Sequence, residues 1–270
     1  MDREKTMADL TLSCTTCALR GRGRDEIEET FRYAPKAGYT QWGLGGPFTW
    51  EPGLIQWLDA GKILKRMEEV GLDALTEVWT PPIPTGNREA AEQGAKHVAM
   101  SAQAAVDLGC GRIVQTGGER REGGLDQTVE GLLRLLERIQ ELPVRVCLEP
   151  HMGSQILTRE DFDALMAKLD TEQVGITVDT GHFHAGGVDW MSLIREYPDR
   201  IYNVHLKDHV GEQSVPIGRG EIDLEGLVTV LREVGYRGPL AVELEVEDPE
   251  NLPLYIEEGH RYMSALIGEE

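Results

Sequence analysis

Eight short apolar segments alternate with helical segments along the whole chain, and this alternation constrains the fold more than any other feature. The apolar segments predict strands over residues 10–14, 39–44, 72–79, 112–116, 143–149, 174–179, 201–207 and 239–245. The segments between them predict helices over 25–36, 54–70, 88–108, 125–142, from 158 onward, and over 190–197, 224–234 and 252–267. Strands that alternate with helices are typical of parallel βαβ units.

The strict order of eight such units predicts a closed (β/α)8 TIM barrel of the α/β class rather than an open, doubly wound sheet. The length of 270 residues is close to the roughly 250 residues of one such barrel. No GxGxxG loop follows a predicted strand, which disfavours a dinucleotide-binding fold. We therefore expect one domain over residues 1–270, with a short flexible N-terminal segment over about residues 1–8.

The composition of the chain indicates which partners, cellular location and cysteine state to expect. The formal net charge of −20 disfavours nucleic-acid partners, because phosphate contacts need Lys and Arg. The sequence has no apolar run long enough for a membrane span and no secretory signal, so we expect a cytoplasmic protein. Cys14 and Cys17 form a lone CxxC, so reduced thiols are expected. The sequence leaves open whether the chain forms a homo-oligomer.

Ionisable residues share one parity at the ends of the last four predicted strands. Alternate side chains of a strand point to opposite faces, and in a barrel one face meets the helices while the other meets the interior. The apolar residues of these strands share one parity, whereas Glu149, Asp179, His205 and Glu243 share the other. Glu245 has the parity of Glu243 and stays open as an alternative. Because catalytic groups of TIM barrels lie at the C-terminal ends of the strands, these side chains should converge there.

Such a convergence predicts a metal site. Several carboxylates placed close together repel one another and lose hydration unless a cation compensates them. Three carboxylates and one imidazole suit one divalent ion, such as Mn, Mg, Co or Zn. Internal polar groups that are satisfied without a metal remain the alternative.

Five short motifs occur in order in the C-terminal half: LEPH (148–151), VDTGH (178–182), HLKD (205–208), GRGEID (218–223) and VELE (242–245). In this ordered set the chain resembles the xylose-isomerase-like TIM-barrel superfamily, specifically its sugar phosphate isomerase/epimerase branch. The N-terminal half is similar mainly in its rhythm of strands and helices. The resemblance implies one metal ion, with manganese favoured, bound by Glu149, Asp179, His205 and Glu243.

The resemblance also implies contacts with a substrate. His182 and Arg219 would contact substrate oxygens, and His151 is a further candidate. Lys207 belongs to the motif that shapes the loop after the seventh strand and is included among the substrate-binding candidates. Trp50, in the loop after the second predicted strand, is expected to cover the substrate and supply an apolar wall for a sugar ring.

Two strand ends depart from the family pattern. Gly43 stands where family members often carry Glu, and the fourth strand ends in Gln115-Thr116 where many relatives have His. These departures affect the expected substrate rather than the expected metal.

The leading hypothesis is a metal-dependent isomerase or epimerase of a small sugar, in which Glu149 and Glu243 move protons through an enediolate. The alternative is a lyase that dehydrates a keto-sugar or keto-inositol after the same proton removal. A non-catalytic sugar-binding barrel is a third hypothesis. A DNA-repair endonuclease on the same scaffold is disfavoured, because the chain lacks that family's additional His and Asp ligands and is strongly acidic.

Overall fold

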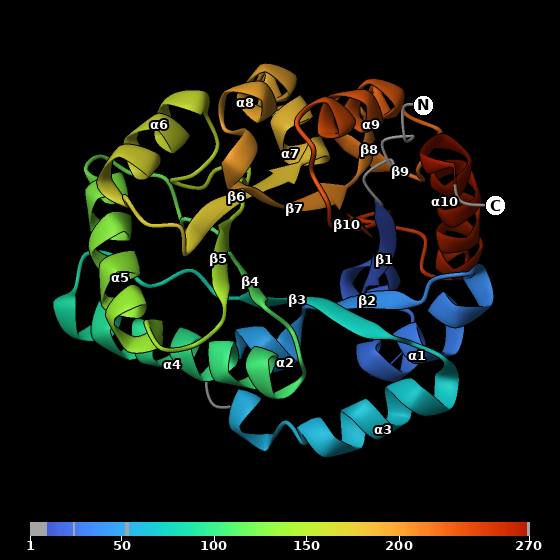
Figure 1. Ribbon diagram of the computed structural model, residues 1–270, viewed down its shortest axis with the longest axis horizontal. Coiled ribbons are helices and arrows are strands. Elements are labelled where there is room, and N and C mark those ends of the chain that lie inside the picture. The colour runs from blue at the N-terminus through green and yellow to red at the C-terminus, as the bar shows by residue number, and fades with distance from the viewer. Residues whose placement is uncertain (1–9, 24, 52–53, 269–270) are drawn as a thin grey trace, which may run out of the picture.

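Eight parallel strands close into a barrel, and helices surround it (Figure 1). The computed structural model describes residues 10–23, 25–51 and 54–268, so the predicted flexible segment over residues 1–8 lies outside the described residues. The barrel strands are β1 (Thr11–Thr15), β2 (Gln41–Leu44), β3 (Ala74–Thr80), β4 (Arg112–Gln115), β5 (Arg145–Leu148), β6 (Val174–Asp179), β7 (Ile201–Leu206) and β10 (Pro239–Val242). Their order around the barrel, β1-β10-β7-β6-β5-β4-β3-β2, confirms the predicted (β/α)8 fold.

Several of the predicted strands continue one to three residues too far at their C-terminal ends. The predicted strand over 143–149 ends at Leu148, and the one over 239–245 ends at Val242. Backbone pairing stops there because the chain turns into the loops at the mouth of the barrel. Glu149 and Glu243 therefore stand directly after the last strand residue, although their amides still donate to Gln115 and Leu206 of the neighbouring strands.

The helices of the described residues lie around the barrel and connect successive strands. They are α1 (Glu26–Ala37), α2 (Pro47–Trp50), α3 (Ala60–Val70), α4 (Arg88–Asp107), α5 (Gly124–Ile139), α6 (Arg159–Lys168), α7 (Thr180–Ala185), α8 (Trp190–Glu196), α9 (Leu224–Glu233) and α10 (Leu252–Ile267). Three 3-10 turns, η1 (Thr16–Leu19), η2 (Ile55–Trp57) and η3 (Pro198–Arg200), accompany them.

The helix predicted over 54–70 is wrong in its first part. The chain forms η2, becomes extended at Leu58, and then begins α3 at Ala60. Asp59 determines this start, because its side chain accepts a hydrogen bond from the backbone N–H of Lys62. The helix predicted from residue 158 onward is α6, and Thr158 and Asp161 form a capping box at its start.

A short hairpin, β8 (Asp208–Val210) and β9 (Gln213–Val215), follows β7 and was not predicted. It turns at Gly211, which has a φ of 58° that a residue without a Cβ adopts readily. The hairpin and α7 extend the C-terminal end of the barrel beside β6 and β7.

The predicted strand parity holds for most of the core. Val146, Leu148, Val178 and Val204 are fully buried in the large cluster between the strands and the helices. Tyr202 is the exception: it has the sequence parity of Val204 but lies in a separate cluster with Trp79, Val114 and Cys147. The register between β6 and β7 shifts at this point, so that Tyr202 is an extra residue that is free to point the other way.

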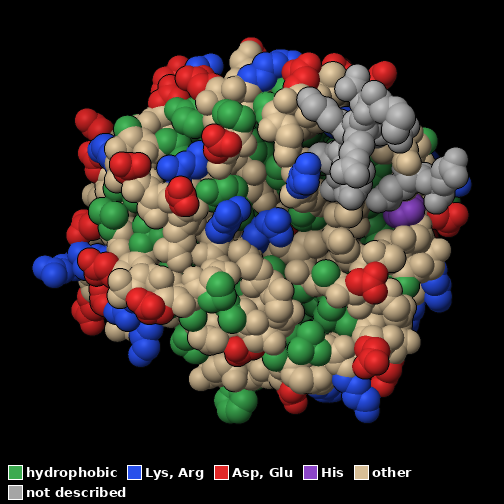
Figure 2. Space-filling view, in the orientation of Figure 1, with side chains coloured by type: hydrophobic (Ala, Val, Ile, Leu, Met, Phe, Trp, Pro, Cys, Tyr) green, Lys and Arg blue, Asp and Glu red, His purple; other side chains and the backbone are tan. Residues whose placement is uncertain are grey.

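Acidic and basic side chains are intermingled on the face of the molecule that Figure 2 shows. Figure 2 shows Asp and Glu side chains around the edge of one face, with Lys and Arg side chains among them. None of the helices in the described part of the chain combines the length and the apolar composition that crossing a membrane requires. All four cysteines are buried free thiols.

Gly175 of β6 gives a test of the packing against Tyr202. A Cβ at this position would overlap the Tyr202 ring and lie 2.6 Å from the backbone oxygen of Arg200. We expect Gly175→Ala to lower the free energy of unfolding by about 1–3 kcal/mol, as overpacking does in other cores. Urea denaturation measures this change.

Gly111→Ala is the matched control, because a Cβ there would have its nearest neighbour, the Pro143 oxygen, at 3.5 Å. It should change the free energy of unfolding by no more than about 1 kcal/mol. Equal stabilities of the two variants would contradict the packing described for Tyr202.

Candidate metal centre

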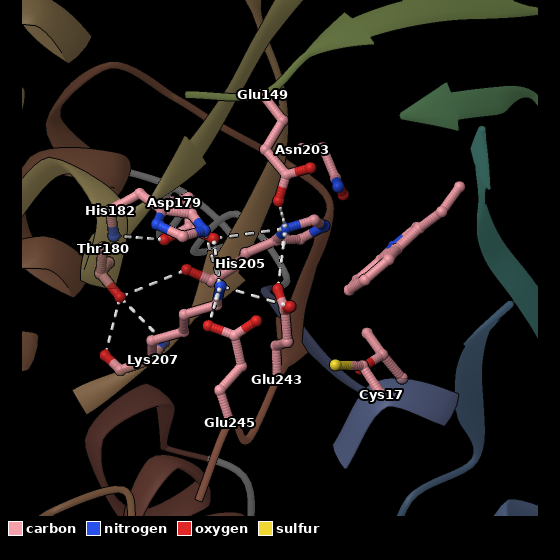
Figure 3. A network of polar contacts seen from close by, with 12 residues as sticks. Cys17, Glu149, Asp179, Thr180, His182, Asn203, His205, Lys207, Glu243 and Glu245 are labelled. Atoms are coloured by element: carbon pink, nitrogen blue, oxygen red, sulfur yellow. Dashed lines mark hydrogen bonds and ion pairs between the residues drawn. The ribbon is translucent and has the colours of Figure 1, made fainter. Parts of the chain in front are cut away.

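The four side chains singled out by parity meet at the C-terminal end of the barrel (Figure 3). Asp179 is the last residue of β6, His205 lies near the end of β7, and Glu149 and Glu243 follow β5 and β10 directly. One donor atom from each side chain lies within 4.8 Å of the donor atoms of the other three. The convergence expected from the sequence is therefore present in the structure.

The imidazole of His205 is the centre of this cluster. Its Nδ1 lies 2.8 Å from Oε1 of Glu149, 3.2 Å from Oε2 of Glu243 and 3.6 Å from Oδ2 of Asp179. None of the four side chains is more than 7% exposed. Three carboxylates in so little water need positive charge beside them.

The pKa values of these side chains reflect both their burial and the charges beside them. Burial alone would lower the pKa of His205, but the carboxylates of Glu77 and Glu149 raise it well above its ordinary value. Burial raises the pKa of Glu149. For Asp179 burial acts in the same direction, but the Lys207 ammonium outweighs it and holds the pKa of Asp179 well below its usual range.

The donor atoms fit a divalent cation. Oδ2 of Asp179 and Oε2 of Glu243 are buried and form no hydrogen bond with any described residue. The other oxygen of the Asp179 carboxylate accepts the His182 amide at 2.7 Å and so caps α7, which leaves Oδ2 pointing toward His205. Three carboxylate oxygens and one imidazole nitrogen are a suitable set for Mn²⁺, Co²⁺ or Zn²⁺.

Lys207 lies beside the cluster rather than on the wall of the pocket. Its buried Nζ is 3.3 Å from both Asp179 Oδ2 and Glu243 Oε1, and 3.0 Å from Glu245 Oε2. It also donates to Nε2 of His182 at 3.1 Å. Glu245, the alternative to Glu243, is thus held by Lys207 and does not belong to the four-residue cluster.

A pocket of about 460 Å³ opens above the cluster, and Glu149 and Glu243 form part of its lining. His151 and His182 lie on one side with their ring centres 4.1 Å apart. Trp50 also lines the pocket and stacks on Trp79 at 6.1 Å. The structure therefore brings three of the five residues predicted to bind substrate, His151, His182 and Trp50, to the pocket.

Arg219 is placed elsewhere. Its guanidinium forms an ion pair with Glu258 and lies 5.1 Å from the ring of Tyr255, both on α10, and it does not line the pocket. The loop that carries it is held by Asp208, which accepts the amides of Gly218 at 2.9 Å and Gly220 at 2.8 Å. The HLKD motif thus fixes the backbone of this loop.

The end of the fourth strand places Gln115 and Thr116 on different faces. Gln115 has the parity of the outer face, and its amide donates to the backbone oxygen of Pro81. Thr116 is the residue that lines the pocket at this strand end. The position of this strand end that lines the pocket therefore carries a hydroxyl group.

The sequence analysis missed Glu77 of β3. Its carboxylate is fully buried and accepts hydrogen bonds from Nε2 of His205 and Nε1 of Trp79, both at 2.9 Å, and from Nδ2 of Asn203. A charged residue inside an apolar strand was the available signal.

Arg20 was also missed. It lines the pocket, lies 5.1 Å from the ring of Trp50, and donates to Sγ of Cys17 at 2.9 Å. It directly follows η1, the 3-10 turn after β1, and so lies at the mouth of the barrel with the other loop residues.

Comparisons with known proteins agree with this geometry. Over residues 31–266 the chain matches the family model described as the xylose isomerase-like TIM barrel. An inosose dehydratase of Lacticaseibacillus casei is 29% identical over 163 residues, which cover 53% of this chain and 54% of that protein. The chain spans about half the length of the curated relatives it matches.

Solved structures share the fold over nearly the whole chain. A structure of the IOLI protein with a bound zinc atom has a TM-score of 0.79 at 16% identity, covering 96% of this chain and 98% of that one. An L-ribulose 3-epimerase has a TM-score of 0.78 at 16% identity, covering 96% and 95%. The matched family model, which covers most of the chain, shows that this protein belongs to the xylose isomerase-like TIM-barrel family.

Proposed function

We propose that this protein is a metal-dependent lyase that removes water from a small polyhydroxylated ketone of the inosose class. The observation that carries the proposal is the buried cluster of three carboxylates and one imidazole at the floor of an open pocket, with two carboxylate oxygens left without hydrogen bonds among the described residues. The matched relatives named inosose dehydratase support water loss over isomerisation.

Glu149, Asp179, His205 and Glu243 would hold one divalent ion. When bound, such an ion polarises the carbonyl of the substrate and makes the neighbouring carbon more acidic. Manganese remains the predicted metal.

Glu149 is suited to remove the proton from the carbon beside the carbonyl. Burial raises its pKa, which brings a carboxylate closer to the range of an effective base at neutral pH. As the C–H bond breaks, its electron pair forms the double bond between the two neighbouring carbons. The C–O bond at the second carbon breaks, and the hydroxyl group leaves with a proton as water.

His151 is suited to supply the proton to the leaving hydroxyl group. Its Nδ1–H donates to the backbone oxygen of Met152 at 3.0 Å, so His151 would act in its doubly protonated form and transfer the proton on Nε2 to the departing oxygen. His182 has another role, because burial lowers its pKa to about 4 and Lys207 donates to its Nε2. It is a neutral partner that orients a substrate hydroxyl group.

The walls of the pocket suit a ring with an apolar edge. Trp50 and Trp79 stack at one side, while Pro81 and Pro82 add further apolar surface. The C–H edge of a cyclic polyol packs on such faces, while its hydroxyl groups reach the two histidines.

An isomerase or epimerase is the second candidate. Glu149 and Glu243 follow β5 and β10, which lie on either side of β7 in the barrel, so one could remove a proton and the other return it on the opposite face. Both reactions begin with the same proton removal, and they differ in the fate of the neighbouring hydroxyl group.

One experiment distinguishes the dehydratase reaction from the epimerase reaction. We expect the Mn²⁺-loaded protein, incubated with an inosose in D2O, to give a product that has lost one water, detected by mass spectrometry. Deuterium incorporation into a ketose or the inosose without water loss would favour the epimerase. No reaction of the metal-loaded protein with either class would contradict both.

Glu149→Gln and His205→Ala test the ligand set. Each removes one donor from a buried cluster, and we expect the metal content after dialysis to fall at least about tenfold, since the ion would lose one of its four protein ligands. Glu257→Gln, an exposed position on α10, is the control for loss of one carboxylate. Undiminished metal content in both ligand variants would rule out this centre.

The lowered pKa of His182 predicts that the free energy of unfolding depends on pH. The folded protein binds a proton at His182 near pH 4, whereas the unfolded chain binds it near pH 6.5, so stability falls as the pH falls through this window. His182→Gln removes this contribution of up to roughly 3 kcal/mol, at about 1.4 kcal/mol per pH unit. The variant should therefore lose less stability than the wild type between these pH values in urea denaturation of the metal-free protein. Identical pH slopes would contradict a buried, neutral imidazole.

A further inference from the structure

We infer that Glu77 is a positioning residue that fixes which nitrogen of His205 faces the metal centre. The inference rests on the proposed function, because it assumes that His205 is a metal ligand. Glu77 lies on β3 and contacts the imidazole from the side opposite Glu149, Asp179 and Glu243. Metal binding would then depend on this carboxylate as well as on the four ligands.

The two nitrogens of His205 point in different directions. Nδ1 faces Glu149, Asp179 and Glu243, whereas Nε2 lies 2.9 Å from Oε2 of Glu77. A neutral imidazole has one N–H and one lone pair. With the proton held at Nε2 by Glu77, the lone pair of Nδ1 is directed at the cluster, where a metal ion would take it.

Glu77 is itself held on both oxygens. Oε1 accepts the indole N–H of Trp79 at 2.9 Å, and Oε2 accepts the amide of Asn203 as well as His205. Three donors therefore point at two oxygens in a place with no exposed surface. Only a group that accepts at both ends satisfies all three, since an amide would present a donor to one of them.

The neighbouring strand is shaped around this carboxylate. A Cβ on Gly43 of β2 would lie 2.8 Å from Oε1 of Glu77, so the absence of a side chain there gives Glu77 its room. The indole of Trp79 also lies over the His205 ring, with the centres 5.3 Å apart. Together these contacts leave the imidazole little freedom to rotate.

A carboxylate that holds the second nitrogen of a ligating histidine sets its tautomer and strengthens it as a ligand, and loss of such a partner costs about 10–100-fold in metal affinity. A purely structural role for Glu77, as a link between β3 and β7, would change the stability of the barrel and leave the affinity of the folded protein for metal unchanged. The two roles thus differ in a measurable way.

The test compares the Zn²⁺ dissociation constants of wild type and Glu77→Gln, measured by competition with a chelator on protein shown to be folded by circular dichroism. We expect Glu77→Gln to bind Zn²⁺ about 10–100-fold more weakly. Glu221→Gln is the matched control, because it removes the carboxylate that pairs with Nε2 of His184 at 3.1 Å, outside the cluster. It should bind Zn²⁺ like the wild type.

A second readout does not depend on the variant folding. Nitrogen NMR of the Zn²⁺-loaded wild type, labelled at histidine and assigned with His205→Asn, should find His205 protonated at Nε2 and coordinated through Nδ1. Coordination through Nε2 would overturn the inference, as would unchanged Zn²⁺ affinity in folded Glu77→Gln. Failure of the wild type to bind Zn²⁺ at all would instead count against the proposed function.

Discussion

The buried carboxylates at one end of the barrel are the constraint on which the rest of the site depends. Glu77, Glu149, Asp179 and Glu243 are each at most 5% exposed, and they surround a single imidazole. Without water, such charges are tolerated only when protons, ammonium groups or a metal ion balance them. Lys207 supplies one permanent positive charge, and the pKa of His205 is raised for the same reason. This shortage of positive charge is what makes the cluster suitable for a divalent ion.

Much of this arrangement could be predicted from the sequence, because it depends on two simple regularities. Side chains alternate along a strand, and the C-terminal ends of parallel strands meet at one end of a barrel. Glu149, Asp179, His205 and Glu243 follow both rules, so their convergence needed only the chain order and the parity of each strand. The capping box at the start of α6 is a local pattern of the same kind.

Features that break the alternation, or that join distant segments, could not be predicted in this way. The register shifts between β2 and β3 beside Gly43, close to Glu77, and between β6 and β7 beside Tyr202, and counting along one strand does not reveal a shift between two. Arg219 and Glu258 are 39 residues apart, and their ion pair depends on how the last loop packs on α10. Such pairings are set by tertiary packing, which short motifs do not encode.

The close approach of Gly43 to Glu77 couples two positions on neighbouring strands. A Cβ at position 43 would lie 2.8 Å from Oε1 of Glu77, so a side chain there would compete with the carboxylate for one small space. A substitution at position 43 would therefore displace the Glu77 carboxylate and, through its hydrogen bond to Nε2, disturb the imidazole of His205.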